Sequence, residues 1–293
     1  MFYNSNCMIT NFDTNKVYIA QGLGLPTYEK TAYSLFSSLY NSQIPCDLLP
    51  CTYLPFHIWV RDYMPIQVRE DKFVCFRYEP DYLKNYPEYK PETNSIIEQL
   101  GIKLCYSSIN LDGGNVISCG DKVILTDKIF KENPQYNHTK LIDELADLLE
   151  AEIILIPWDK YEEYGHADGM VRYIEGNRVL LNNYCDFDKL LRKRLVNELS
   201  PHFEIEELHY GTYAKNSWSY INFLHVGHDI FVPMLNEKID FIAYEQIATT
   251  YSMCKCHQIN NCISLVKEGG ALNCSTWNIS CKLSDIEQEQ VLF

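Results

Sequence analysis

The stretch LDGGN, residues 111–115, is a short polar segment with two adjacent glycines, and it follows the β-rich run KLCYS. Comparable segments recur along the chain, and their central polar residues are separated by 50, 54, 56 and 52 positions. The five segments are WVRDYMP around Asp62, LDGGN around Asp112, GHADG around His166, SYINF around Asn222 and GGALNC around Cys274. Self-similarity with a period of roughly 50 residues is typical of repeat and propeller architectures.

Each interval contains the same predicted elements. Apolar spacing and helix-start signals predict helices at residues 28–41, 91–101, 138–150, 187–200 and 237–252. Turn signals between β-rich runs predict hairpins at 119–122, 175–178 and 226–229. A further β-rich run, CISLVK, predicts a strand at 262–267. Five strand–strand–helix–strand units closed in a ring predict an α/β propeller in which the polar segments meet at one axis. Because no linker interrupts this pattern, we expect residues 1–293 to form a single domain.

Composition and charge restrict the class of protein. With 293 residues, 46% of them hydrophobic, the chain can build a sizeable core. The net charge of −14 argues against nucleic acid and anionic membranes as partners and favours a cationic ligand. The N-terminal MFYNSNCMITNF lacks the features of a signal peptide, and no apolar run is long enough to span a membrane. The 12 cysteines therefore predict reduced thiols in a cytoplasmic protein. The sequence leaves open whether identical chains form a homo-oligomer.

One cluster contains residue types that bind metals, namely Cys254, Cys256, His257 and Cys262 in CKCHQINNC. The C-x-C-H spacing is not a standard zinc-ribbon arrangement, and no second pair of ligands lies nearby in the sequence. We therefore expect partly buried thiols on a strand, and neither a metal nor a cofactor.

At one axis, the five segments together supply a cysteine, a histidine and several carboxylates. A thiolate is a strong nucleophile near neutral pH, and a neighbouring imidazole can act first as an acid and then as a base. Carboxylates raise the pKa of a thiol and repel oxyanions, so they do not suit an anionic substrate or a peptide carbonyl. They suit a planar cation with several N–H donors, because carboxylate–guanidinium pairs are bidentate and charge-assisted. We also expect Cys274 to be largely a thiol until the cation arrives.

The motifs IWVRDYMP, LDGGN, GHADG, SYINF and GGALNC resemble, in order, the motif set of the agmatine deiminase and bacterial-type peptidylarginine deiminase family. The resemblance covers nearly the whole chain, from the first predicted strand to Trp277. It implies the pentein fold, a five-bladed α/β propeller, in agreement with the repeat. It also implies cofactor-free hydrolysis of a guanidinium group to a ureido group with release of ammonia.

The resemblance assigns roles to individual residues. Cys274 would attack the guanidinium carbon, and His166 would protonate the departing ammonia and then activate the water that hydrolyses the covalent thiouronium intermediate. Asp112 would orient His166. A turn-forming role is a serious alternative for Asp112, since Asp and Gly are common in turns.

The remaining candidates would bind the substrate. Asp62 and Asp168 would hold the guanidinium nitrogens, and Trp59 would form part of the pocket wall. Asn222 resembles a polar support residue near the catalytic centre, and a purely structural hydrogen-bonding role is an equal alternative for it.

Two positions depart from the family pattern. Agmatine-type members usually have Glu before the paired glycines, where this chain has Asp112, and His before the nucleophile, where this chain has Asn273. The first departure bears on the contact with His166, and the second suggests a substrate other than agmatine.

Four functions therefore stay in competition. They are a deiminase of agmatine or a related small guanidino compound, a peptidylarginine deiminase, an amidinotransferase, and a non-catalytic binding module. The tyrosine-rich stretch 78–92 is expected to be a surface loop that covers the pocket, with Arg77 and Lys84 available to a substrate carboxylate.

Overall fold

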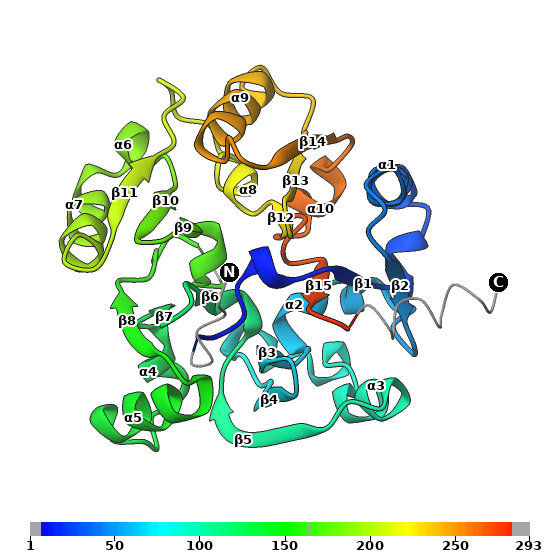
Figure 1. Ribbon diagram of the computed structural model, residues 1–293, viewed down its shortest axis with the longest axis vertical. Helices are drawn as coiled ribbons and strands as arrows, with labels where there is room; N and C mark the ends of the chain where they lie inside the picture. Colours follow the sequence, from blue (N-terminus) through cyan, green and yellow to red (C-terminus); the bar gives the residue numbers. More distant parts are fainter. Residues whose placement is uncertain (1–6, 163, 283–293) are drawn as a thin grey trace.

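The structure is a computed structural model, and it describes residues 7–162 and 164–282. Five three-stranded sheets stand around a common axis (Figure 1). In each sheet the strand nearest the axis is antiparallel to the middle strand, and the middle strand is parallel to the outer strand. The predicted α/β propeller is therefore the observed fold.

The sheets follow one another along the chain, except that the first is completed by the last strand. From the axis outward they are β15 (Thr276–Ile279), β1 (Lys16–Ala20) and β2 (Cys46–Leu49); β3 (Ile66–Arg69), β4 (Lys72–Arg77) and β5 (Leu104–Asn110); β6 (Ile117–Ser118), β7 (Lys122–Thr126) and β8 (Glu152–Ile156); β9 (Val171–Glu175), β10 (Arg178–Leu181) and β11 (Glu204–Glu207); and β12 (Leu224–Val226), β13 (Asp229–Pro233) and β14 (Lys255–Ile259). Strand β15 pairs with β1 in antiparallel register from Lys16 opposite Ile279 to Ile19 opposite Thr276, and this pairing closes the ring.

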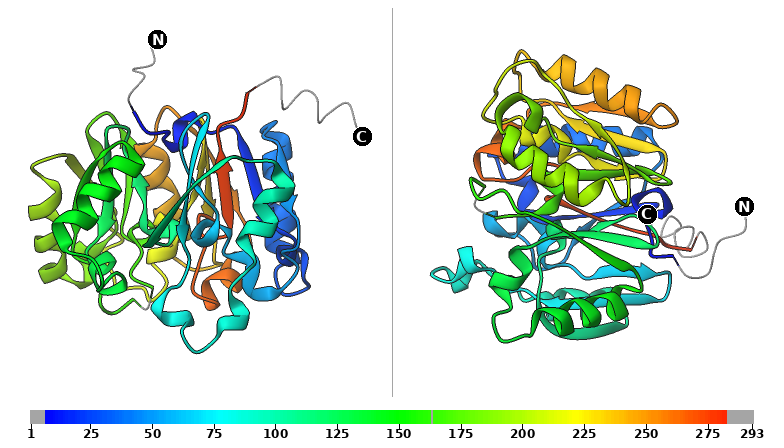
Figure 2. Two further views of the ribbon diagram at one scale, coloured as in Figure 1. Left: turned by 90° about the horizontal axis from the view of Figure 1, so that it is seen from below. Right: turned by 90° about the vertical axis from the view of Figure 1, so that its left-hand side faces the viewer.

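A helix connects the middle strand of each sheet to the outer strand and lies at the rim of the ring (Figures 1 and 2). These helices are α1 (Glu29–Asn41), α3 (Thr93–Leu100), α5 (His138–Leu149), α7 (Lys189–Leu199) and α9 (Asp240–Thr250). The five predicted helices are confirmed within a few residues, and so are the three predicted hairpins. Among the described residues, no helix is both long enough and apolar enough to span a membrane.

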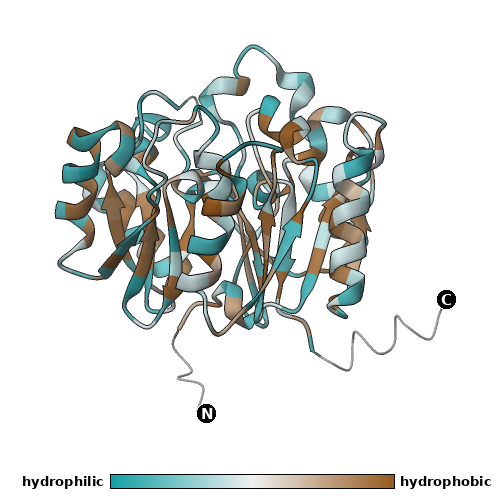
Figure 3. Ribbon diagram, turned by 90° about the horizontal axis from the view of Figure 1, so that it is seen from above, coloured by the Kyte–Doolittle hydropathy of each residue, from teal (hydrophilic) through white to brown (hydrophobic). Residues whose placement is uncertain are grey.

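Helix α5 shows why these segments are helical and how they pack. The side chain of Asn137 accepts hydrogen bonds from the backbone amides of Thr139 and Lys140, which satisfies donors that the first turn leaves open. Leu141, Leu145 and Leu149 recur every four residues and are fully buried in the core on one face of the helix. Burial of each leucine contributes about 1.5–3 kcal/mol relative to an exposed side chain. Figure 3 shows the same division, with hydrophobic residues concentrated on the strands.

One predicted strand is wrong. The run at 262–267 forms the short helix α10 (Ile263–Lys267), and the outer strand of this sheet is β14 instead. Cys262, Leu265 and Val266 are buried, a spacing of three and four residues that fits a helix and not a strand. The cluster at 254–262 accordingly begins just before β14 and ends after it, with two half-buried thiols and one buried thiol, as expected. The prediction of a single domain over 1–293 stays a prediction, since both ends of the chain lie outside the described residues.

Candidate active site

Four of the five polar segments form a single helical turn just before the strand nearest the axis. These turns are α2 (Val60–Tyr63), η6 (Gly113–Asn115), η7 (Ala167–Gly169) and α8 (Trp218–Ile221), and the fifth segment makes backbone turns before β15. Helix α2 contacts η6, η6 contacts η7, and η7 contacts α8. Segments about 50 residues apart in the sequence are therefore brought together at one end of the axis, as the repeat predicted.

His166 lies between two carboxylates. Its Nε2 is 2.9 Å from Oδ2 of Asp112, and its Nδ1 is 3.6 Å from Oδ1 of Asp62. Burial alone would lower the pKa of His166, but the charge of Asp62 and the hydrogen bond to Asp112 outweigh burial and raise the pKa above its ordinary value. The imidazole is therefore held as a cation that can donate a proton. The contact exists although the chain has the shorter Asp at position 112.

Both carboxylates have further hydrogen bonds that fix them. The hydroxyl of Tyr82 donates to Oδ2 of Asp112 at 2.9 Å, and the amide of Gly114 donates to Oδ1 of Asp62 at 3.1 Å. Burial raises the pKa of Asp62 to about 7, with the neighbouring Asp112 and Asp168 adding to the increase and His166 opposing it. Tyr82 was not among the predicted site residues, because a tyrosine in a tyrosine-rich loop carries no distinctive signal.

Cys274 lies next to the third carboxylate. Its Sγ is 3.5 Å from Oδ2 of Asp168, in hydrogen-bonding position, and its backbone amide donates to Oδ1 of Asn222 at 3.3 Å. Burial raises the pKa of the Cys274 thiol well above its ordinary value, and the charges of Asp168 and Asp62 raise it further. The free protein therefore has a neutral thiol at position 274, as the sequence predicts.

Asn273, one of the two positions that depart from the motif pattern, contacts Asp168. Its side-chain amide donates to Oδ2 of Asp168 at 2.7 Å, and its backbone amide donates to the carbonyl of Asn222 at 3.0 Å. The residue is 4% exposed. Asn273 thus orients the carboxylate of Asp168 beside Cys274.

Two glycines allow this close packing. A Cβ atom on Gly114 would lie 2.6 Å from Oδ1 of Asp62 and 2.7 Å from Nδ1 of His166. A Cβ atom on Gly270 would lie 2.2 Å from the six-membered ring of Trp59. Such distances are far below van der Waals contact, so any larger residue at either position would displace a predicted site residue.

Two cavities open onto this cluster from different sides. The first, here called the aromatic cavity, has a volume of about 550 Å³. Its aromatic lining residues are Tyr28, Phe56, Trp59, Tyr78, Tyr82, Tyr86, Tyr89 and Tyr164. The second, here the acidic cavity, has a volume of about 980 Å³ and carboxylates from Asp159, Glu162, Asp168, Asp186 and Asp188. Cys274 and His166 line both cavities, whereas Asp62 lines the first and Asp168 the second. A bound planar group between them would face one carboxylate on each side.

The loop at 78–92 extends beyond the ring at this end (Figure 2) and supplies five lining residues of the aromatic cavity. Neither Arg77 nor Lys84 lines either cavity. Arg77 instead forms an ion pair with Glu79, with Nη1 at 3.6 Å from Oε2. The expectation that these two cations meet a substrate carboxylate is therefore not met by their positions. Lys215 is the one lysine or arginine among the described residues that line the two cavities.

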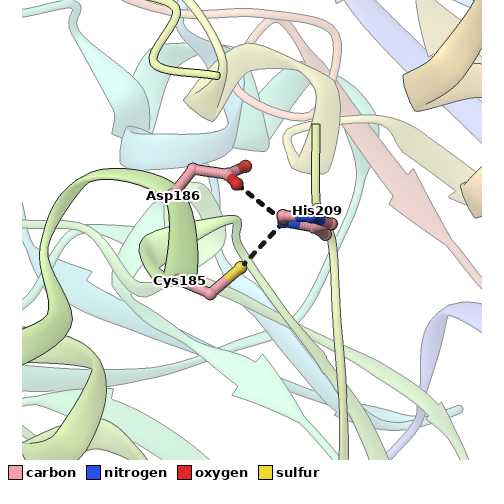
Figure 4. Close-up of side chains that lie close together, drawn as sticks. All are labelled: Cys185, Asp186 and His209. Carbon is pink, nitrogen blue, oxygen red and sulfur yellow. Dashed lines mark hydrogen bonds and ion pairs between the residues drawn. The ribbon is translucent and has the colours of Figure 1, made fainter. Parts of the chain in front are cut away.

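The residues at 254–262 do not form a group of candidate metal ligands. Within the part of the chain that the structure describes, the group that does is Cys185, Asp186 and His209, whose side chains point toward one another (Figure 4). Nδ1 of His209 is 2.6 Å from Oδ1 of Asp186. The backbone amide of Gly211 donates to the same oxygen, and the backbone amide of Tyr210 donates to Oδ2 of Asp186. These bonds explain the group as an anchor for the chain after β11.

Comparison with known proteins agrees with this geometry. The model of the Porphyromonas-type peptidyl-arginine deiminase family matches residues 27–279. The chain belongs to this family. Membership makes it one of the guanidino-modifying deiminases, hydrolases that act on guanidino C–N bonds. No curated protein matches the chain significantly.

Solved structures show the same pentein fold. An agmatine deiminase from C. jejuni has a TM-score of 0.74 at 17% identity, with 97% of this chain and 99% of that chain covered. An agmatine deiminase of Enterococcus faecalis has a TM-score of 0.74 at 16% identity, with 95% of this chain and 97% of that chain covered. The N-terminal domain of a cyanobacterial arginine dihydrolase has a TM-score of 0.60 at 12% identity, with coverage of 91% and 98%.

Proposed function

We propose that this family member hydrolyses the guanidinium group of a small guanidino compound, agmatine or a relative, to a ureido group and ammonia. The observation that carries the proposal is the placement of Cys274 and His166 between Asp62 and Asp168, where two cavities meet. A guanidinium at this point pairs with a carboxylate on each side, and such pairs are bidentate and charge-assisted. Twelve cysteines suit a reducing compartment, so we place the reaction in the cytoplasm.

The first half of the reaction uses the thiol and the imidazolium. The thiol proton of Cys274 leaves through Asp168, to which Sγ is hydrogen-bonded at 3.5 Å, because the bound cation offsets the surrounding negative charge. The thiolate attacks the guanidinium carbon and forms a neutral tetrahedral adduct. His166 then gives its proton to one amino group, the C–N bond breaks, and ammonia departs. The group that stays bound to Cys274 is an S-alkylthiouronium cation.

The second half reverses the role of His166. Now neutral, it takes a proton from water as the water oxygen attacks the thiouronium carbon. The C–S bond of the new adduct then breaks, the thiolate of Cys274 leaves, and the hydroxyl proton restores the thiol. Asp112 holds the imidazole in place through both halves, at 2.9 Å from Nε2.

The charges of the two cavities favour a substrate tail without a carboxylate. The charged lining residues of the aromatic cavity are Asp62, His166 and Glu268. In the acidic cavity, the five carboxylates are accompanied by one lysine, Lys215, which is exposed. A carboxylate in either cavity would lie among negative charges, whereas the amine of agmatine would be attracted to them and to the tyrosine faces. We therefore rank agmatine above free arginine.

A peptidylarginine substrate is the second candidate, and exposed tyrosines around the aromatic cavity favour it. Tyr86 and Tyr89 line the cavity and are 49% and 38% exposed, so they are available to a peptide backbone or side chain. Tyrosine is enriched at protein and peptide interfaces because it combines apolar area with a polar tip. An amidinotransferase stays a third alternative.

Ammonia release from matched guanidino compounds tests the proposal. We expect turnover to fall in the order agmatine, N-acetyl-arginine amide, arginine, because only the last carries a free carboxylate. Ammonia formed from none of them would overturn the deiminase. A preference for the acetylated amide would favour the peptidyl function, and loss of ammonia in favour of amidino transfer to added glycine or lysine would indicate a transferase.

A further inference from the structure

A third cavity lies between the strands nearest the axis, below the catalytic segments. Its volume is about 70 Å³, and it is lined by residues of β3, β6, β9 and β15 together with the chain around residues 8–14. Two guanidinium-bearing side chains, Arg61 and Arg172, line it. No carboxylate is found among its described lining residues, whose polar members include Asn11, Thr14, Gln67, Ser118 and Asn278.

Arg172 is a buried cation without a counter-charge in contact. It is 2% exposed, and its Nη2 has no hydrogen-bond partner. Its guanidinium carbon lies 4.7 Å from the centre of the Phe223 ring, which gives the charge one apolar face. Within residues 7–162 and 164–282, it forms no ion pair with a carboxylate oxygen at 4.0 Å or less.

Arg61 lies at the same cavity with neutral partners. Its Nη2 donates to the side-chain oxygen of Asn278, and its Nε donates to the backbone carbonyl of Asn273 at 3.3 Å. Like Arg172, it forms no ion pair with a carboxylate in the described part of the chain. Two guanidinium cations at one small cavity repel each other, and a buried charge is costly unless it is paired.

We propose that this cavity binds a small monovalent anion, such as chloride, between the guanidinium groups of Arg61 and Arg172. A volume of about 70 Å³ exceeds the roughly 10–15 Å³ that one water requires, so a monatomic anion with one or two waters fits. The buried hydroxyl of Ser118, which has no hydrogen-bond partner, can supply a further donor. This site is separate from the proposed deiminase reaction, and its tests do not depend on turnover.

The anion would also support the nucleophile through Arg61. The backbone amide of Arg61 donates to the carbonyl of Cys274 at 3.1 Å, and its side chain binds the carbonyl of Asn273. Holding Arg61 in place therefore holds the turn that presents Cys274. The anion is a positioning and stabilising ligand, and it does not touch the substrate.

Thermal unfolding in sodium chloride and in sodium gluconate at equal ionic strength tests the proposal. For the wild-type protein we expect Tm to be about 5 °C higher in chloride at a concentration a hundredfold above Kd, because a ligand that binds only the folded state stabilises it. Arg172→Met should abolish this difference. Arg194→Met, on the exposed face of α7, removes the same charge elsewhere and should keep it. Equal Tm in the two salts, or the same chloride effect in Arg172→Met, would overturn the proposal.

Crystals of the wild-type protein grown in bromide provide a second test that needs no variant. We expect an anomalous difference peak between the guanidinium groups of Arg61 and Arg172. Bromide elsewhere and only water in this cavity would refute the site, even if the Arg172→Met variant failed to fold.

Discussion

The two ends of the propeller axis carry opposite charge, although neighbouring residues build both. Asp62 faces His166 at the catalytic end, whereas Arg61 lines the small cavity between the strands. Asp168 and Arg172, four residues apart, are divided in the same way. In both pairs, the carboxylate lies at the catalytic end of the axis and the guanidinium group lies at the small cavity.

This difference bears on the protonation of Cys274, which lies beside the carboxylates. Burial and Asp168 and Asp62 raise the pKa of Cys274, and charges of the opposite sign lie on the far side of the same backbone turn. Each end is electrostatically prepared for a ligand of opposite sign. Variants at the catalytic end should therefore affect turnover far more than stability.

The largest effect is expected from loss of the nucleophile. Cys274→Ala should reduce ammonia release roughly 10⁴-fold or more, because no covalent intermediate can form. Binding of the guanidino compound, measured by calorimetry, should persist, since both carboxylates remain. Cys105→Ala is the matched control, because Cys105 is an exposed thiol on β5 and its loss should leave turnover unchanged. Wild-type activity in Cys274→Ala would exclude the mechanism.

Removal of the charge behind His166 should have the next largest effect. Asp112→Asn should lower kcat roughly 10²–10³-fold, because an amide does not stabilise the imidazolium that donates the proton. Tyr82→Phe, which removes one hydrogen bond to Asp112, should lower kcat only about tenfold. Equal losses in the two variants would show that the charge of Asp112 is not what matters, and would favour its role as a turn former.

Ionisation of Cys274 should depend on the occupant of the site. In the free protein, thiolate absorbance from Cys274 should appear only above the ordinary thiol pKa, because burial and the carboxylates favour the neutral form. A bound guanidinium inhibitor should shift this titration to lower pH, since a cation favours the thiolate. The difference between wild type and Cys274→Ala isolates this thiol from the others, and an unchanged titration with inhibitor would contradict substrate-assisted ionisation.

The smallest effect is expected at Asn273. Because its amide binds Asp168 and does not line either substrate cavity, Asn273→Ala should lower kcat/KM by about three- to tenfold, the usual range for one buried hydrogen bond. The factor should be the same for agmatine and for N-acetyl-arginine amide. A change confined to one substrate would show that Asn273 selects the tail, as its departure from the family pattern suggests.

The repeat made most of the fold predictable. Glycine-marked polar segments about 50 residues apart and helices with a clear apolar stripe fixed the order of elements. Two strands nearest the axis, β3 and β15, belong to no predicted hairpin, because they are short and carry buried polar residues such as Gln67 and Asn278. Their hydrophobic pattern is weak, so hydropathy does not reveal them. The run at 262–267 predicts a strand although it forms a helix, because a short segment rich in apolar residues fits either structure.

The predicted site residues do lie together, but their supports could not be read from the sequence. Asp112 and His166 come from repeated motifs, whereas Tyr82 comes from the loop between β4 and α3, and Arg172 comes from within β9. Motif spacing says which turns meet at the axis. It does not say which side chains from outside the motifs reach them, because that depends on loop paths and on strand register.

Closure of the ring by β15 ties the position of Cys274 to the pairing of β1 with β15. Cys274 lies two residues before this strand, and Thr276 pairs with Ile19 of β1. During synthesis, the other four polar segments emerge before Cys274. Cys274 therefore reaches its place at the axis only when β15 pairs with β1, so the meeting of all five polar segments depends on closure of the ring.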